Sequence, residues 1–294
     1  MKTLDKIKLV NSLANNSNKR IKKEANPFAD NGFSKIRELT ISITNVCNLT
    51  CKGCGFNVPN QVSPVIGVGI DQHLASLMLL KNLGIKLGKL VIVGGEATLS
   101  KSLGEYLSKV KSLCIAEKIE LVTNGLYPYG LKEHVAMQLD SIVFSDYICT
   151  DRFESTWRSY LSLLGYKGEI DFRRKEAWDD LVSLVNNAAE QVQEHWNTCF
   201  YRKYDVTLER GRLFSCSRIA KKNFNDQGLL INTETTINHV QEYLSSNLPK
   251  QACYSCATVG ANSKIPVAEQ VSSNLVKLAD KAEKFMCEEI EHDA

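Results

Sequence analysis

Three cysteines lie within eight residues near the start of the chain, in the sequence Cys47-Asn-Leu-Thr-Cys51-Lys-Gly-Cys54. Thiolates are soft ligands that select zinc or iron–sulfur clusters. A structural zinc site needs a fourth Cys or His nearby, and residues 55–75 offer His73 alone. Three thiolates on one loop instead leave one iron of a four-iron cubane open to another ligand. The spacing favours an iron–sulfur cluster, with zinc or unligated thiols as the alternatives.

Four later cysteines form a second group, which ends in a Cys-x-x-Cys pair: Cys199, Cys216, Cys253 and Cys256. Four thiolates suit a tetrahedral structural zinc and a fully ligated iron–sulfur cluster equally well. Ten cysteines need such an explanation, because a cytoplasmic protein does not rely on disulfides. The cysteines outside both groups are Cys114, Cys149 and Cys287.

Strand and helix patterns alternate around the first group. Strands are expected at 39–44, 89–93, 119–123 and 141–145, and helices at 71–83, 103–116 and 131–139. This alternation implies crossover units and a parallel sheet. The cysteine trio, Gly94-Gly95-Glu96 and Asn124-Gly125 each follow a strand, so we expect them to meet at the carboxyl edge of that sheet.

The second half of the chain has a different pattern. We expect a helix at 157–164, a strand at 169–173, and a long helix at 178–194. Residues 204–209 and 212–215 form a predicted hairpin that turns at Gly211 and ends at Cys216. A helix at 236–245 leads to the closing cysteine pair, and a terminal helix covers 267–290.

The cysteine trio and the Gly94-Gly95-Glu96 sequence about 40 residues later resemble the radical S-adenosylmethionine (SAM) superfamily over residues 37–256. The resemblance implies an α/β fold, a partial (β/α)6 TIM-like barrel, in which SAM chelates the open iron of a [4Fe–4S] cluster. Glu96 and the two glycines would bind its amino group, and Asn124 would lie beside them. Ser145 and Arg173, at the ends of later strands, are candidates for the cofactor's ribose and carboxylate.

Two positions depart from the family pattern. The residue before the third cysteine is usually aromatic and contacts the adenine, but here it is Gly53. The proline that usually follows Gly-Gly-Glu is Ala97. Both departures bear on cofactor geometry rather than on cluster ligation.

The second cysteine group resembles the twitch appendage of the same superfamily, a shortened relative of the SPASM domain that holds one auxiliary [4Fe–4S] cluster. A small C-terminal β-hairpin and helix would form it, and a structural zinc is the alternative. The implied organisation is a basic helical lead-in (1–36), the partial barrel (37–195), the twitch-like domain (196–262) and a C-terminal helix (263–294). The implied cofactors are SAM and two [4Fe–4S] clusters.

The resemblance implies an oxidoreductase or epimerase in which a 5′-deoxyadenosyl radical abstracts hydrogen from a sugar, cyclitol or aminoglycoside-like substrate. Modification of a ribosomally made peptide is the alternative. Epimerisation requires a hydrogen donor, and Cys149, which follows the fourth strand, is the catalytic candidate. Such enzymes take electrons from an external donor such as flavodoxin or ferredoxin.

Composition excludes other classes. The net charge is only +3, and no basic stripe with interleaved aromatics indicates nucleic-acid binding. We expect no secretory signal and no membrane span, and therefore a cytoplasmic enzyme of natural product biosynthesis.

Overall fold

The computed structural model describes residues 26–30, 32–60, 70–222, 227–259 and 264–292. Its main sheet contains β1 (Lys35–Ser42), β2 (Lys86–Val93), β3 (Ala116–Thr123), β4 (Ser141–Ser145), β5 (Glu169–Arg173), β7 (Val206–Glu209), β8 (Arg212–Phe214) and β9 (Leu229–Leu230). The strand order is β5-β4-β3-β2-β1-β7-β8-β9. The first six of these strands pair in parallel, and β8 and β9 pair antiparallel.

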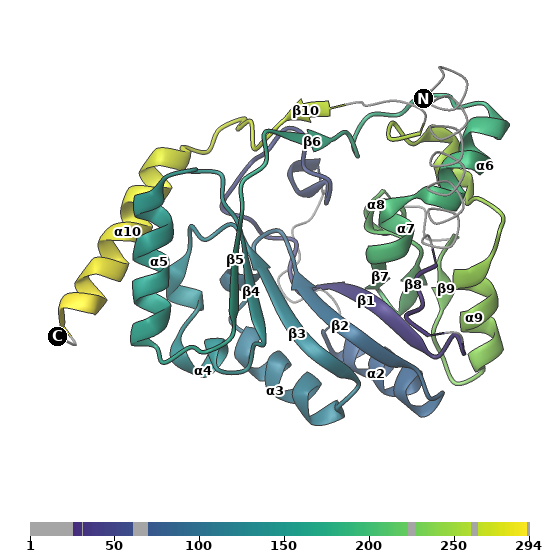
Figure 1. The fold of residues 1–294 in the computed structure, drawn as a ribbon, viewed down its shortest axis with the longest axis horizontal. Helices are drawn as coiled ribbons and strands as arrows, with labels where there is room; N and C mark the ends of the chain where they lie inside the picture. The colour runs from purple at the N-terminus through teal and green to yellow at the C-terminus, as the bar shows by residue number, and fades with distance from the viewer. Residues whose placement is uncertain (1–25, 31, 61–69, 223–226, 260–263, 293–294) are drawn as a thin grey trace, which may run out of the picture.

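Helices connect the parallel strands where the sequence predicts them: α2 (Ile70–Asn82), α3 (Leu103–Leu113), α4 (Glu133–Ala136) and α5 (Asp151–Leu163). α4 is shorter than the helix expected at 131–139, and α5 begins at Asp151 rather than at residue 157. Figure 1 shows α2 and α3 on one face of the curved sheet and α5 at its β5 end. The last four residues of β2 are buried, as expected for a central strand covered on both faces. The mostly parallel sheet confirms the predicted α/β partial barrel.

The predicted hairpin forms, but its place in the fold differs from that of a separate appendage. β7 pairs in parallel with β1, with Leu39 opposite Val206, so the hairpin continues the main sheet. Arg210 and Gly211 both have positive φ, 49° and 70°, which is typical of a tight hairpin turn. The sixth parallel strand therefore lies beside the first strand rather than beside the fifth. The division into four segments stays a prediction.

The expected long helix at 178–194 is wrong. The chain forms β6 (Ala177–Asp179), an irregular segment, and only then α6 (Ala189–Thr198). The side chain of Asp180 accepts hydrogen bonds from the amides of Val182 and Ser183, at 2.9 and 2.8 Å, which turns the backbone out of helix geometry. β6 pairs instead with β10 (Lys264–Pro266), a contact that sequence periodicity does not reveal.

The remaining helices surround the second cysteine group and the C-terminus: α7 (Phe200–Tyr204), α8 (Ser217–Lys221), α9 (Ile237–Ser245), the 3-10 turn η5 (Gln251–Ser255) and α10 (Leu275–His292). The expected helix at 236–245 is confirmed as α9, with Thr236 as its N-cap. α10 begins later than expected and packs beside α5, where Arg152 pairs with Glu283 at 2.8 Å (Figure 1). Residues 1–25 of the expected basic lead-in lie outside the described residues.

His73 lies inside α2 and has no exposed surface. Burial, with a smaller effect of the Lys221 charge, lowers the pKa of His73 from 6.5 to about 4. Protonation must therefore favour the unfolded chain. We expect the free energy of unfolding to fall by about 3 kcal/mol as the pH drops from about 6.5 to about 4. The measurement is urea unfolding across this pH range, with His73→Leu for comparison. If the curves of the two proteins run parallel, the buried imidazole has no such effect.

Candidate active site

A cavity of about 450 Å³ opens at the carboxyl ends of the first four strands. The cysteine trio, Gly94-Gly95-Glu96, Asn124 and Ser145 all line it, so the structure brings these predicted site residues together. Cys51 is buried and the other two thiols are half-buried. Parallel strands place their carboxyl ends at one edge of the sheet, which is why segments far apart in sequence converge here.

The two glycines are required by close backbone contact. The amides of Gly95 and Glu96 donate 2.8 Å hydrogen bonds to the carbonyls of Thr44 and Val46, which lead into the cysteine loop. A Cβ on Gly95 would lie 2.4 Å from the Val46 carbonyl oxygen and 2.9 Å from the Cys47 Cβ. Only glycine lets the end of β2 approach the loop this closely. The Gly-Gly pair thus positions Cys47 as well as opening space for a ligand.

Glu96 is a buried carboxylate that joins the ends of β2 and β3. Its Oε1 accepts hydrogen bonds from the Thr98 amide (3.1 Å) and from the hydroxyls of Thr98 and Thr123 (both 2.7 Å). Its Oε2 accepts the Asn124 amide at 2.7 Å. Burial raises the pKa of Glu96 despite these donors. A carboxylate facing a cavity under these conditions is well suited to pair with an ammonium group.

Polar contacts reach the cysteine sulfurs from three segments. The Leu49 amide donates to Cys47 Sγ at 3.4 Å, and Asn124 Nδ2 approaches the same sulfur at 4.0 Å. Gln270 Nε2 donates to Cys51 Sγ at 3.0 Å, although it lies 219 residues away in sequence. Burial is the main cause that raises the pKa of Cys47 to about 12, and it also raises that of Cys51. The buried thiols therefore keep their protons until a metal ion or cluster binds the sulfurs and displaces those protons.

Three soft donors that line one cavity fit a cluster with one open iron. His73, the fourth zinc ligand that the sequence offered, is buried in α2 and does not line the cavity. Among the described residues, no three His, Cys, Asp or Glu side chains converge on a single metal ion.

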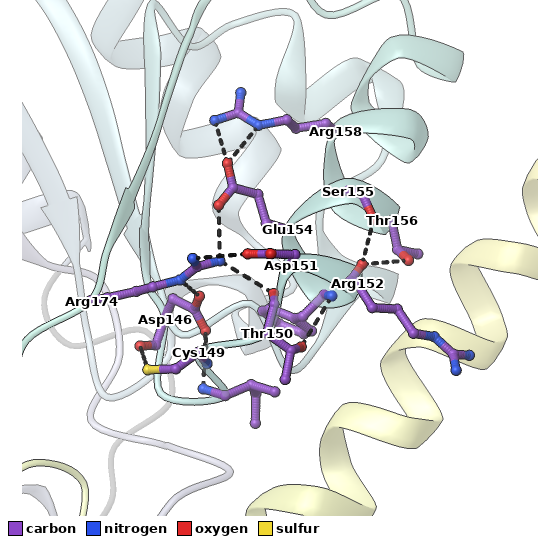
Figure 2. Close-up of polar contacts among 12 residues, drawn as sticks. Asp146, Cys149, Thr150, Asp151, Arg152, Glu154, Ser155, Thr156, Arg158 and Arg174 are labelled. Atoms are coloured by element: carbon purple, nitrogen blue, oxygen red, sulfur yellow. Dashed lines mark hydrogen bonds and ion pairs between the residues drawn. The ribbon is translucent and has the colours of Figure 1, made fainter.

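The structure does not bring Arg173 and Cys149 to this cavity. Arg173 is exposed and pairs with Asp171 at 2.9 Å on β5. Cys149 is also exposed, with φ of 57°, and its Sγ donates to the Asp146 carbonyl at 3.4 Å. Figure 2 shows this bend held by Asp146, which accepts the Cys149 amide at 2.8 Å and Arg174 Nε at 2.7 Å. The network fixes the loop after β4 and turns Cys149 away from the lining residues.

The cavity wall also contains charged and aromatic groups that no sequence pattern predicted. In the β6–β10 pair Lys264 stands opposite Asp179, and their side chains form an ion pair. Tyr201 donates its hydroxyl to Asp179 Oδ2 at 2.7 Å, and Lys175 completes the polar wall. The bond from Lys264 is the main cause that lowers the pKa of Asp179. The expected helix across residues 178–194 concealed this strand pair.

The glycine before the third cysteine has a structural reason. A Cβ on Gly53 would lie 2.2 Å from the Ile265 Cδ1 of β10 and 3.8 Å from Trp178. Trp178 and Tyr147 line the cavity and make an edge contact, with ring centroids 5.6 Å apart. Side chains from β6, β10 and the loop after β4 therefore occupy the space beside the position where the family places an aromatic residue.

The second cysteine group surrounds a smaller cavity, of about 30 Å³. Its lining includes Cys199, Cys216, Cys253 and Cys256. Burial raises the pKa of Cys199 to about 11 and that of Cys253 to about 12. Arg202 also lines the cavity and is buried, and its Nε has no hydrogen-bond acceptor among the described residues. The four thiols and this buried donor line the same small cavity, and they fit either of the two expected groups, a fully ligated cluster or a structural zinc.

The two cavities are neighbours. Leu181 and Tyr201 line both of them. His195 stands at the second cavity, where its Nε2 lies 3.3 Å from the Thr258 hydroxyl, which in turn lies 3.1 Å from Cys256 Sγ. His195 thus reaches Cys256 only through Thr258, and the four cysteines remain the candidate ligands of this cavity.

Comparison with known proteins gives partial matches. No family model matches the chain. A probable GTP 3',8-cyclase of Sulfolobus acidocaldarius is 34% identical over 99 residues, covering 34% of this chain and 29% of that protein. Molybdenum cofactor biosynthesis protein 1 of Drosophila melanogaster is 28% identical over 221 residues, covering 65% of this chain and 38% of that protein. The matches therefore span about a third of these relatives' length.

A solved structure is also similar, that of BtrN in complex with AdoMet and 2-DOIA. It has 12% sequence identity and a TM-score of 0.45, with 70% of this chain and 81% of that chain covered. Within the described residues no helix is long and apolar enough to cross a membrane.

Proposed function

We propose that this chain, which belongs to the radical SAM superfamily, dehydrogenates a small hydroxyl-bearing substrate of the sugar, cyclitol or aminoglycoside class. The observation that carries the proposal is the pair of adjacent cavities. The first has three thiols and room for further ligands, and the second has four thiols. Cys47, Cys51 and Cys54 would hold a [4Fe–4S] cluster with one open iron, and the second group would hold a fully ligated one.

The residues at the strand ends would hold SAM. Glu96 Oε2 accepts one hydrogen bond from the protein, so it retains capacity for the cofactor's ammonium group. Gly94 and Gly95 present backbone without side chains at the same edge, and Ser145 and Tyr147 continue the lining along the end of β4. A reduced cluster held by Cys47, Cys51 and Cys54 would supply the electron for cleavage of SAM to methionine and a 5′-deoxyadenosyl radical.

The polar wall of the cavity suits a polar small molecule. Asp179, Lys264 and Tyr201 offer donors and acceptors of both charge signs, and Trp178 adds an aromatic face. Small-molecule cavities combine apolar lining with a few such polar groups. An alcohol that loses a hydrogen atom to the radical, then a proton and an electron, becomes a ketone. The proton passes to solvent, and the electron given up to the second cluster balances the one used to cleave SAM.

Dehydrogenation is favoured over epimerisation by where the thiols lie. An inverted product requires a hydrogen donor on the substrate's far face. Among the described residues, the cysteines lining the first cavity all belong to the trio, and Cys149 lines neither cavity. A second cluster beside the cavity offers an electron acceptor, which oxidation of the substrate radical requires.

The test is anaerobic turnover with reductant, SAM and a panel of deuterated aminocyclitols, GTP and short peptides. We expect deuterium to move from a cyclitol carbon into 5′-deoxyadenosine, and the product to be lighter by two hydrogen atoms. Cys149→Ala should leave rate and product unchanged, because Cys149 does not line the cavity. An inverted product that is lost in Cys149→Ala would establish epimerisation instead. Turnover of GTP or peptide alone would overturn the substrate class.

A further inference from the structure

The chain between β10 and α10 lies along the first cysteine loop, and we call residues 268–273 the strap. The Lys52 amide donates to the Glu269 carbonyl at 2.8 Å, and the Val271 amide donates to the Thr50 carbonyl at 3.0 Å. The Ser273 amide donates to the Thr50 hydroxyl at 3.1 Å. These bonds join the strap to the loop in the manner of an antiparallel strand, with Cys51 opposite Gln270.

The side chain of Gln270 is held with its nitrogen toward a cluster cysteine. Nε2 donates to Cys51 Sγ at 3.0 Å and to the Ala268 carbonyl at 2.6 Å. Oε1 accepts the Thr50 amide at 2.8 Å. A backbone amide can only donate, so this last bond fixes which end of the Gln270 side chain is oxygen. The amide therefore cannot flip to turn its oxygen toward the sulfur without losing the bond to Thr50.

An N–H donor to a ligating sulfur acts on the charge of the cluster. Reduction adds one negative charge, part of which resides on the thiolate sulfurs, and a donor stabilises the reduced form more than the oxidised form. Hydrogen bonds to the sulfurs and exposure to solvent are among the factors that set the reduction potentials of iron–sulfur clusters. The strap supplies the bond and also leaves Cys51 only 7% exposed.

We propose that Gln270 is a positioning residue that raises the reduction potential of the cluster held by Cys47, Cys51 and Cys54, through its hydrogen bond to Cys51. The inference rests on the cluster-binding role proposed above for the trio. It makes the C-terminal strap part of the redox site, although the strap contributes no ligand. The strap follows β10 in sequence, and Lys264 of β10 belongs to the polar wall of the cavity.

The experiment is a redox titration followed by electron paramagnetic resonance (EPR) on the full-length, doubly reconstituted protein. The signal that changes on addition of SAM identifies the first cluster. In Gln270→Leu the donor is removed. In Gln270→Glu the donor is removed but an acceptor for the Thr50 amide remains. We expect both variants to lower the ratio of reduced to oxidised first cluster about tenfold at a fixed potential, equivalent to about 59 mV for one electron.

The matched control is Ser273→Ala, which removes the hydroxyl contacts to the Asn48 carbonyl and to the Thr50 hydroxyl (both 3.2 Å) but leaves Gln270 in place. We expect it to keep the wild-type potential. An unchanged potential in both Gln270 variants would overturn the inference, as would an equal shift in Ser273→Ala. Failure of both variants to load the first cluster would assign Gln270 to assembly and also overturn it. Absence of any SAM-sensitive signal in the wild-type protein would instead overturn the proposed function.

Discussion

Cys47→Ala is expected to abolish cleavage of SAM, because the substitution removes one of three ligands from the first cluster. The iron content should fall from about eight to about four per chain, since each cubane holds four irons. The rate of 5′-deoxyadenosine formation should fall by about three orders of magnitude or more, because loss of the cluster removes the whole cleavage reaction rather than one contact to it. Chromatography of 5′-deoxyadenosine and iron analysis give the two readouts.

A matched control is Cys114→Ala. This cysteine is exposed after α3, has a positive φ of 50° and lines neither cavity. The same chemical change there should leave iron content and cleavage at wild-type values. Cleavage that persists in Cys47→Ala at more than a tenth of the wild-type rate would contradict ligation by Cys47.

Cys253→Ala has the second large expected effect, and it separates the two cysteine groups. The second cavity loses one of its four thiols, so the iron content again falls to about four per chain. Cleavage of SAM should continue, because the first cavity keeps all its ligands. The oxidised product should fall by about a hundredfold relative to 5′-deoxyadenosine, because the substrate radical lacks its electron acceptor.

The ratio of 5′-deoxyadenosine to oxidised product is the measurement for this variant. A structural role for the second group predicts another result, in which both products fall together as the protein unfolds. Circular dichroism before and after reconstitution distinguishes these cases. An unchanged ratio in a folded variant that has lost half its iron would contradict the role as acceptor.

The barrel half of the fold was predictable from local sequence. The strands at 141–145 and 169–173 are confirmed to the residue. The first is almost wholly buried and reads as a short apolar run, whereas the second alternates exposed and half-buried residues, and both patterns are visible in the local sequence. The trio, Gly94-Gly95-Glu96 and Asn124 meet as expected, since the carboxyl ends of parallel strands share one edge. The motifs and the local pattern agree here.

The wrong predictions concern parts of the fold that depend on contacts between residues distant in sequence. Residues 177–179 form β6 rather than the start of a helix because they pair with β10. This partner lies 85 residues further along the chain. Nothing in the local pattern around Trp178 indicates that pairing. The same strand pair places Asp179 and Lys264 in the cavity wall, so the error about structure also concealed the polar wall of the site.

Two candidate residues were predicted from strand position alone and do not reach the cavity. Arg173 ends β5 as expected, but its side chain points to Asp171 on the surface. Cys149 follows β4, but the buried carboxylate of Asp146 captures the loop backbone and turns it. Which way a side chain leaves a loop depends on such bonds. Gln270 was missed for a related reason, because no motif marks a residue of the C-terminal strap as a neighbour of Cys51.

In the proposed function, Cys47, Cys51 and Cys54 hold a cluster with one iron open to SAM, beside a second, fully ligated cluster. The decisive measurement is EPR of the reduced, reconstituted protein with and without SAM. We expect two [4Fe–4S] signals, of which one changes on addition of SAM and is absent from Cys47→Ala. Two signals that are both indifferent to SAM, or a protein that binds zinc and no iron, would contradict it.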